Sequence, residues 1–191
     1  MFDLIGLSAG TVAVCIGVLI LLVLVYVVIV YNRLVTLRNR VKNAWAQIDV
    51  QLKRRYDLIP NLVETVKGYM KHEKETLTEI TRLRAQLVSG DVRERAKADN
   101  MLTATLKSLF AVAENYPQLR ASENFQKLQD ELTGTENKIS YIRTAYNDAV
   151  YEFNTACDVF PSNIIAGIFG FKHEQLFEAA PSEKEPVKVK F

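Results

Sequence analysis

Side chains that commonly catalyse reactions or bind metals are few in this sequence and lie far apart. The two histidines, His72 and His173, are about a hundred residues apart, whereas a zinc site needs three or four ligands that converge. Glu73 follows His72, but Thr76 stands where the second histidine of a His-Glu-x-x-His motif belongs. The sequence therefore predicts no metal site.

Cys157 is a further candidate nucleophile, but no histidine lies near it in the sequence to act as its base. It lies on or beside an apolar helical stripe, so we expect it to pack in a core. Cys15 belongs to a different segment, which argues against a disulfide and fits a reducing compartment. There is no glycine-rich phosphate loop and no Gly-x-Ser-x-Gly motif. We therefore predict no catalytic residue, no cofactor and no enzymatic activity.

Basic residues cluster at Lys53-Arg54-Arg55, just before Asp57. They are either solvated helix charges or a site, and the better functional interpretation is an ion pair between subunits that involves Arg54, Arg55 and Asp57. Lipid headgroups are too far, because about 20 helical residues separate the cluster from the apolar segment, roughly 30 Å, and charges are screened within about 8 Å. The basic residues closer to that segment are better placed for lipid phosphates, namely Arg33, Arg38, Arg40 and Lys42.

The apolar segment that positions these charges runs without a charged residue from Leu4 to Asn32. About 20 apolar residues suffice for a membrane-spanning helix. The segment is too long for a secretory signal, and the preceding Met1-Phe2-Asp3 contains no basic residue. Because Lys and Arg follow it and none precedes it, the positive-inside rule places the N-terminus outside and the remainder in the cytoplasm.

Small residues recur on one face of this predicted span, at Gly6, Gly10, Ala13 and Gly17. Such a face lets two membrane helices approach closely. The spacing is equally consistent with chance, because glycine and alanine are common in membrane spans.

Apolar residues continue at helical spacing beyond the membrane. The first part of this pattern, here called the proximal seam, comprises Leu34, Leu37, Val41, Ala44 and Ile48. The stripe then shifts by four residues and comprises Leu52, Tyr56, Ile59, Val63, Val66 and Met70. Pro60 either kinks the helix or begins a new one capped by Asp57. The unchanged spacing favours a kinked, continuous helix, and a break near residue 72 is also possible.

Three further helical patterns follow. One includes Leu77, Ile80, Leu83 and Leu87 and ends at the turn 89–91; the next covers about 92–115; the last runs from Phe125 to Ala156 and stops at Phe160-Pro161. The apolar segment 163–171 is too short to span a bilayer. It either folds onto the bundle and covers an end of the core, or contacts another subunit or the membrane surface.

Tyrosine and asparagine side chains place polar groups on the last long helix, at Tyr141, Tyr146, Asn147, Tyr151 and Asn154. Buried polar groups need hydrogen-bond partners, so these residues are expected to fix the register of the bundle. A ligand pocket between helices is the alternative interpretation.

Together these patterns predict an all-α protein, with an N-terminal transmembrane helix that continues into an elongated antiparallel bundle of three to four long helices. The predicted parts are a short outer N-terminus (1–3), the transmembrane helix (4–32), a cytoplasmic helical domain (33–180) and a disordered tail (181–191). If one helix ran from the membrane to Val88, the shorter helices could not cover the proximal seam. An uncovered seam would favour a homo-oligomer, whereas a break near residue 72 would let the chain bury the seam itself.

Several stretches resemble the LemA family. They include Arg54-Arg55-Tyr56-Asp57-Leu58-Ile59-Pro60-Asn61-Leu62-Val63, His72-Glu73, Ala121-Ser122-Glu123-Asn124-Phe125, Tyr146-Asn147 and the ending from Phe160-Pro161 to Gly170-Phe171. The resemblance covers nearly the whole chain. It implies a bacterial membrane protein with a short outer N-terminus and a cytoplasmic helical bundle, and it implies no reaction.

We therefore expect a non-enzymatic, membrane-anchored and homo-oligomeric scaffold that organises proteins or lipid at the cytoplasmic face of the cell membrane. The alternative is a monomeric helical adaptor for a membrane partner such as a protease or a sensor. The expected partners are membrane lipid, further copies of the chain and a membrane protein whose identity is unknown. The balance of 24 basic and 22 acidic residues, mixed along the chain, predicts no binding to nucleic acid.

Overall fold

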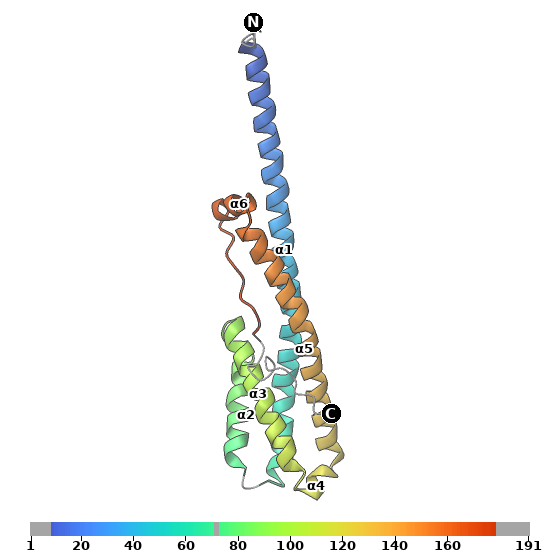
Figure 1. Cartoon of the computed structure of the whole chain (residues 1–191). Helices are drawn as coiled ribbons and strands as arrows, with labels where there is room; N and C mark the ends of the chain where they lie inside the picture. Colours follow the sequence, from blue (N-terminus) through green and yellow to red (C-terminus); the bar gives the residue numbers. More distant parts are fainter. Residues whose placement is uncertain (1–8, 71–72, 179–191) are drawn as a thin grey trace, which may run out of the picture.

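The computed structural model describes residues 9–70 and 73–178, and within these ranges every regular element is a helix. The helices are α1 (Ala9–Lys67), α2 (Lys74–Gln86), α3 (Val92–Ala113), α4 (Pro117–Arg120), α5 (Glu123–Asp158) and α6 (Ser162–Ile168). Figure 1 shows α1 extending well beyond an elongated bundle of the other helices. The predicted all-α fold, with a long apolar N-terminal helix and a helical bundle, is confirmed.

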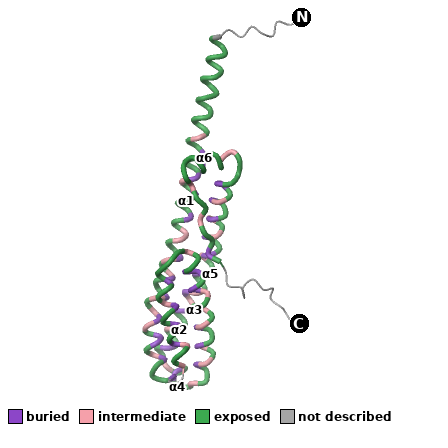
Figure 2. The backbone as a smooth tube through the Cα atoms, turned by 90° about the vertical axis from the view of Figure 1, so that its left-hand side faces the viewer, coloured by how far each residue is buried: buried purple, intermediate pink, exposed green. Residues whose placement is uncertain are grey.

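The first part of α1 meets the criteria for a membrane span. It is the one helix of the described residues that is long and apolar enough to cross a bilayer, and its most apolar window is not buried at all. Figure 2 shows this part standing free of the bundle as an exposed tube. From Gly10 to Tyr31 it has a length of about 33 Å, close to the thickness of a hydrocarbon core of about 30 Å. The predicted boundaries 1–3 and 181–191 lie outside the described residues.

Pro60 lies inside α1, which continues to Lys67. Proline has no N–H, so the carbonyl of Tyr56, four residues earlier, loses its helical donor. Arg84 of α2 replaces that donor, because its Nε–H donates to the Tyr56 carbonyl at 2.7 Å. The Arg84 guanidinium also lies 3.8 Å from the centre of the Tyr56 ring. The predicted continuity of the helix through Pro60 is confirmed, and Asp57 does not begin a new helix.

The chain reverses between α1 and α2, where the sequence left a break possible. Helix α1 ends at Lys67, just before Gly68, and α2 begins at Lys74. This reversal allows α2 to pack beside α1 rather than to extend it. The chain therefore adopts the compact arrangement, and not the single helix to Val88.

Helix α5 runs antiparallel to α1 along most of the bundle (Figure 1). Cross-helix contacts show the direction, because Arg54 pairs with Glu131 and Arg40, further toward the membrane, lies 3.5 Å from Glu152. Nearer still to the span, the ring of Tyr31 lies 4.8 Å from that of Phe169, just beyond α6. This antiparallel arrangement matches the prediction.

The expectation that the proximal seam would be uncovered is wrong. Leu34, Leu37, Val41 and Ile48 are each less than 5% exposed, and Ala44 is partly buried. The cover comes from α5 and the segment after it, which reach this part of α1 because the chain reverses after Lys67. The seam is therefore part of the monomer's own core, and it gives no reason to expect an oligomer.

The remaining helical stripes are buried largely as predicted. Leu77, Ile80, Leu83 and Leu87 are core residues as predicted. Helix α3, which was predicted over about 92–115, buries Leu102, Leu106 and Leu109 on one face. Helix α3 starts with a capping box, in which the Asp91 carboxylate accepts from the Glu94 N–H at 2.8 Å and Glu94 accepts from the Asp91 N–H. One core position differs from the prediction. Arg55, and not Tyr56, occupies the buried face of α1 between Leu52 and Ile59.

The chain after α5 folds back in two parts. Helix α6 lies at the membrane-proximal end of the bundle and buries Ile165 and Ala166. Residues 171–178 then run without helical structure back along the bundle, and we call them the C-terminal strap. Residues 163–171 were expected either to pack on the end of the bundle or to contact another subunit or the membrane surface. Packing on the bundle is confirmed for the side of α6 that carries Ile165 and Ala166.

Candidate functional site

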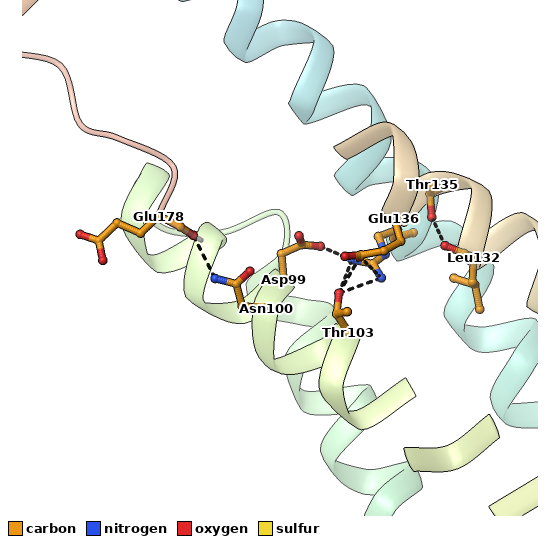
Figure 3. Close-up of polar contacts among 8 residues, drawn as sticks. Asp99, Asn100, Thr103, Leu132, Thr135, Glu136 and Glu178 are labelled. Carbon is orange, nitrogen blue, oxygen red and sulfur yellow. Dashed lines mark hydrogen bonds and ion pairs between the residues drawn. The ribbon is translucent and has the colours of Figure 1, made fainter. Parts of the chain in front are cut away.

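A cluster of charged residues lies in the interior where α1, α3 and α5 meet (Figure 3). Arg55 of α1 is 2% exposed and donates to Asp99 of α3, which is equally buried. Its second terminal nitrogen lies 2.9 Å from a carboxylate oxygen of Glu136 on α5. Thr103 accepts from Arg55 at 3.1 Å and donates to Glu136 at 2.6 Å. The cluster thus links three helices through one guanidinium.

The balance of forces on Asp99 is typical of a buried ion pair. Burial raises the pKa of the Asp99 carboxyl above its usual value, and the charge of Arg55 opposes that rise. Perturbed carboxyls occur at active sites, but also in structural ion pairs. Here the ionised groups are paired with one another across α1, α3 and α5, so the cluster joins these helices.

The charges proposed for contacts between subunits are used largely within one chain. Arg55 is enclosed in the interior cluster, and Arg54 pairs with Glu131 on α5 at the surface. The assignment of Arg55 to a subunit interface is therefore wrong, because its partners lie within the same chain. Arg54 remains about half exposed beside Glu131, so its part in an interface stays a prediction. Asp57 is exposed on α1, and its part in an interface stays a prediction.

The basic residues predicted to face lipid divide into two pairs. Arg38 lies 4.0 Å from Glu174, and Arg40 lies 3.5 Å from Glu152, so both contact acidic residues of their own chain. Arg33 and Lys42 are exposed and form no ion pair within the described residues. Arg33 is the first charge after the apolar segment. It remains the best-placed candidate for a lipid phosphate.

The small-residue face of the span is only partly described. Gly6 lies outside the described residues, whereas Gly10, Ala13 and Gly17 are exposed on α1. A methyl group added at Gly17 would meet no atom within 4 Å. Packing within the chain therefore does not require a glycine at position 17, and helix association through this face stays a prediction.

Polar side chains of α5 bind the C-terminal strap through its backbone. The Asn154 amide accepts from the Glu174 N–H at 2.9 Å and donates to the Glu174 carbonyl at 3.0 Å. Seven residues earlier, Asn147 makes the same two bonds to Phe177, at 2.9 and 3.1 Å. The partner of these two asparagines is thus the strap, a non-helical segment that no sequence pattern predicted.

Tyr146 also binds the strap, whereas Tyr141 and Tyr151 are exposed to solvent. Its hydroxyl donates to the Gln175 carbonyl at 2.7 Å. Burial, and secondarily the charge of Glu174, raise the pKa of Tyr146 to about 12. Tyr141 and Tyr151 are 82% and 73% exposed, so the expectation that they are buried polar groups is wrong.

The strap ends against the single tryptophan. The ring of Phe177, which is fully buried, lies 6.2 Å from that of Trp45, and Trp45 lies 5.6 Å from Tyr146. On the other side, the Arg95 guanidinium lies 4.9 Å from the Trp45 ring centre. Arg95 also donates to the Leu87 carbonyl at the end of α2 at 2.7 Å. This aromatic and cationic cluster therefore fastens the strap to α1, α3 and α5.

The residues considered for catalysis do not come together. Cys157 is buried, and burial raises the pKa of its thiol, which disfavours the nucleophilic thiolate. His173 lies at the surface 2.9 Å from Asp158, and His72 is outside the described residues. Among the described residues, no group of three or more histidine, cysteine or acidic side chains is close enough to hold a metal ion.

Among the described residues, one candidate span continues into a helical bundle that is held together by interior charges and a strap. This architecture defines a membrane-associated helical protein. The chain belongs to the LemA family, whose sequence profile matches residues 44–191. It is similar to Protein LemA of Metamycoplasma hominis, with 27% identity over 82% of this chain and 72% of the relative. It is also similar to Magnetosome protein MamQ 2 of Paramagnetospirillum magneticum and Magnetosome protein MamQ of Magnetospirillum gryphiswaldense, at 23% and 21% identity. Both of these alignments cover 82% of this chain and 68% of the relative.

Proposed function

We propose that this chain is a non-enzymatic, membrane-anchored scaffold that organises proteins or lipid at the cytoplasmic face of the bacterial cell membrane. The observation that carries the proposal is α1 itself. One helix without a break forms the candidate span and then the central helix of the bundle. Because no linker intervenes, the bundle is held at a fixed orientation to the membrane. That property suits a platform for other molecules better than a tethered enzyme.

Two further observations support this proposal. The buried charges Arg55, Asp99 and Glu136 are paired with one another between helices, and their arrangement serves to join α1, α3 and α5. The abundance of Lys and Arg just after the span favours a cytoplasmic bundle. Relatives that are named as magnetosome proteins also fit an organising role.

Self-association is the second element of the proposal, and we assign it to the span. Gly10 and Gly17 lie on one face of the exposed apolar part of α1, where two copies of a helix could pack closely. The monomeric adaptor is the second candidate function, and the burial of the proximal seam favours it. A chain that buries its own core has no need of a second copy.

The mass of the detergent-solubilised protein distinguishes the two functions. For the scaffold we expect an oligomer that becomes smaller in the double variant Gly10→Leu and Gly17→Leu, with the protein still in the membrane fraction. Cys15→Leu is the matched control, because it adds bulk on roughly the opposite side of the helix, about 140° from Gly10 and about 160° from Gly17. A wild-type protein that is monomeric at every concentration would overturn the self-associating scaffold. The adaptor predicts, instead, a stoichiometric partner in crosslinked pull-downs.

A further inference from the structure

The turn after α5 and the outward side of α6 expose an apolar surface that the bundle does not use. Phe160 and Ile168 are 80% and 73% exposed, and Ile164 and Phe169 are each about half exposed. We call these four residues the α6 patch. No charged residue occurs between Asp158 and Lys172. Exposed apolar clusters of this kind mark contacts with a partner or a membrane.

The patch lies level with the end of the candidate span. The rings of Phe169 and Phe171 lie 4.8 and 5.8 Å from that of Tyr31, the last apolar residue before Asn32 and Arg33. Figure 1 shows α6 beside α1, at the point where α1 emerges from the bundle. If α1 spans a bilayer, the patch is therefore at the height of the lipid headgroups, where aromatic rings are favoured.

A cavity between α1 and the end of α5 crosses this boundary. Its volume is about 470 Å³, and its wall includes Tyr26 and Ile29 from the span and Phe160 from the turn. Tyr26 is seven residues before Arg33, or about 10 Å along the helix. Arg33 and Glu152 line the same cavity at its charged end. The lining thus changes from apolar to charged in the same order as a lipid, from acyl chain to headgroup.

The fold fixes the patch in this orientation. Ile165 and Ala166 of α6 are buried against the bundle, so Ile164 and Ile168, one turn apart, face outward. Local hydrogen bonds satisfy the backbone around the turn: the Ser162 hydroxyl lies 2.7 Å from the Ala156 carbonyl, and the Phe171 N–H donates to the Ala166 carbonyl at 2.9 Å. Satisfied backbone groups are a requirement for a segment that contacts the apolar part of a membrane.

We propose that the α6 patch is a second membrane contact, which inserts into the interfacial region of the same leaflet from which α1 emerges. The occupant of this surface is phospholipid, because the patch continues the lipid-facing surface of the span and one of its residues, Phe160, lines a cavity together with Tyr26 and Ile29 of the span. Interfacial segments of this type bury their apolar side chains about 5–10 Å into the boundary between headgroups and acyl chains. The chain is then held to the membrane at two points. This inference depends on the span being in the bilayer, but not on the scaffold function.

Fluorescence quenching by brominated lipid tests the proposal on the full-length protein. Phe160→Trp and Ile168→Trp are introduced separately into a Trp45→Phe background, and each protein is reconstituted into vesicles of phosphatidylcholine and phosphatidylglycerol. We expect both tryptophans to lose most of their emission when the acyl chains are brominated. Tyr141→Trp is the matched control on an exposed site of α5 far from the membrane, and it should keep nearly all of its emission.

Leu22→Trp, in the middle of the span, separates the two premises. Quenching at residue 22 together with an unquenched, red-shifted emission at residues 160 and 168 would overturn the proposal while leaving the span in the bilayer. A blue-shifted but unquenched emission at residues 160 and 168 would overturn it in favour of a protein partner. Absence of quenching at residue 22 would overturn both the span and the second contact. Circular dichroism confirms that each variant retains its helical content.

Discussion

Arg84 donates its Nε–H to the Tyr56 carbonyl, the acceptor that Pro60 leaves without a helical donor. A proline inside a helix costs about 3 kcal/mol, and here a side chain from the neighbouring helix replaces the missing hydrogen bond. The guanidinium also covers the Tyr56 ring. The proline and the packing of α2 on α1 are thus coupled through one carbonyl.

This coupling is testable with a double-mutant cycle. We expect Arg84→Met to lower the free energy of unfolding by about 1–3 kcal/mol, because the Tyr56 carbonyl loses its donor. In a Pro60→Ala background, the residue 60 N–H can serve that carbonyl, so the same Arg84→Met change should cost less. Urea unfolding of the four proteins measures the difference. Equal costs in both backgrounds would show that Arg84 stabilises the bundle only by packing.

The interior charge cluster should be sensitive to loss of its cation. Arg55→Met leaves Asp99 and Glu136 buried without their partner, and breaking a buried pair in this way costs about 3–5 kcal/mol. Arg54→Met is the control, since its surface pair with Glu131 should contribute at most about 1 kcal/mol. Chemical denaturation compares the two variants. Similar stabilities for Arg55→Met and Arg54→Met would contradict the structural role of the cluster.

The C-terminal strap should contribute to stability through Phe177. Phe177→Ala empties a fully buried site beside Trp45 and should cost about 3–5 kcal/mol. The change should also expose Trp45, so its fluorescence emission should shift to the red. Tyr141→Ala removes an aromatic ring that is 82% exposed and is the control, with little change expected. An unshifted Trp45 spectrum in Phe177→Ala would show that the strap does not cover it.

The stability of the bundle should depend on pH through Tyr146. Its pKa is raised from 10.0 to about 12 in the folded protein, so between these values the folded state keeps a proton that the unfolded state loses. The stabilisation is complete below about pH 10 and is lost as the pH rises toward about 12. Unfolding of the wild type should therefore become easier over this range, by more than in Tyr146→Phe. Tyrosinate absorbance should show one late-titrating tyrosine that this variant lacks. Identical pH profiles would contradict the assignment.

Substitution in the proximal seam should change stability without changing assembly. Leu37 is 4% exposed within one chain, so Leu37→Ala should cost about 2–5 kcal/mol. The particle mass in detergent should be the same as that of the wild type. Val50→Ala, at an exposed position of the same helix, is the control. A smaller particle for Leu37→Ala at retained folding would show that the seam does meet another copy.

The helices themselves could be predicted because their apolar spacing repeats over many turns. The pattern around Ile139 and Phe153 predicted a long helix with a buried face, and both residues are buried. Spacing does not say which helix covers a given face, and for the seam this depended on the short reversal after Gly68. A shift by one residue is equally hard to see, and so Tyr56 was placed in the core where Arg55 lies.

The candidate sites were harder to predict from the sequence, because their residues come from distant parts of the chain. The partners of Arg55 come from α3 and α5, 44 and 81 residues away in the chain, and no local pattern connects them. The strap is not helical, so its sequence shows no helical spacing of apolar residues. It is held instead through its backbone, by the amides of Asn147 and Asn154. The two asparagines are seven residues apart and thus lie on one face of α5. That spacing is the signal that could have indicated a partner segment.

Because α1 is continuous, the angle about its axis between the faces of the candidate span and the faces of the bundle is fixed. At about 100° per residue, the face with Gly10 and Gly17 is turned roughly 150° from the seam that α5 covers. A neighbour that meets the glycine face inside the bilayer would therefore find the side of the bundle that points away from α5. Because no break separates the two parts of α1, a rotation of the candidate span about its axis would turn the bundle with it. With the candidate span in a bilayer, contacts of the span would thus set the direction in which the bundle faces along the membrane plane.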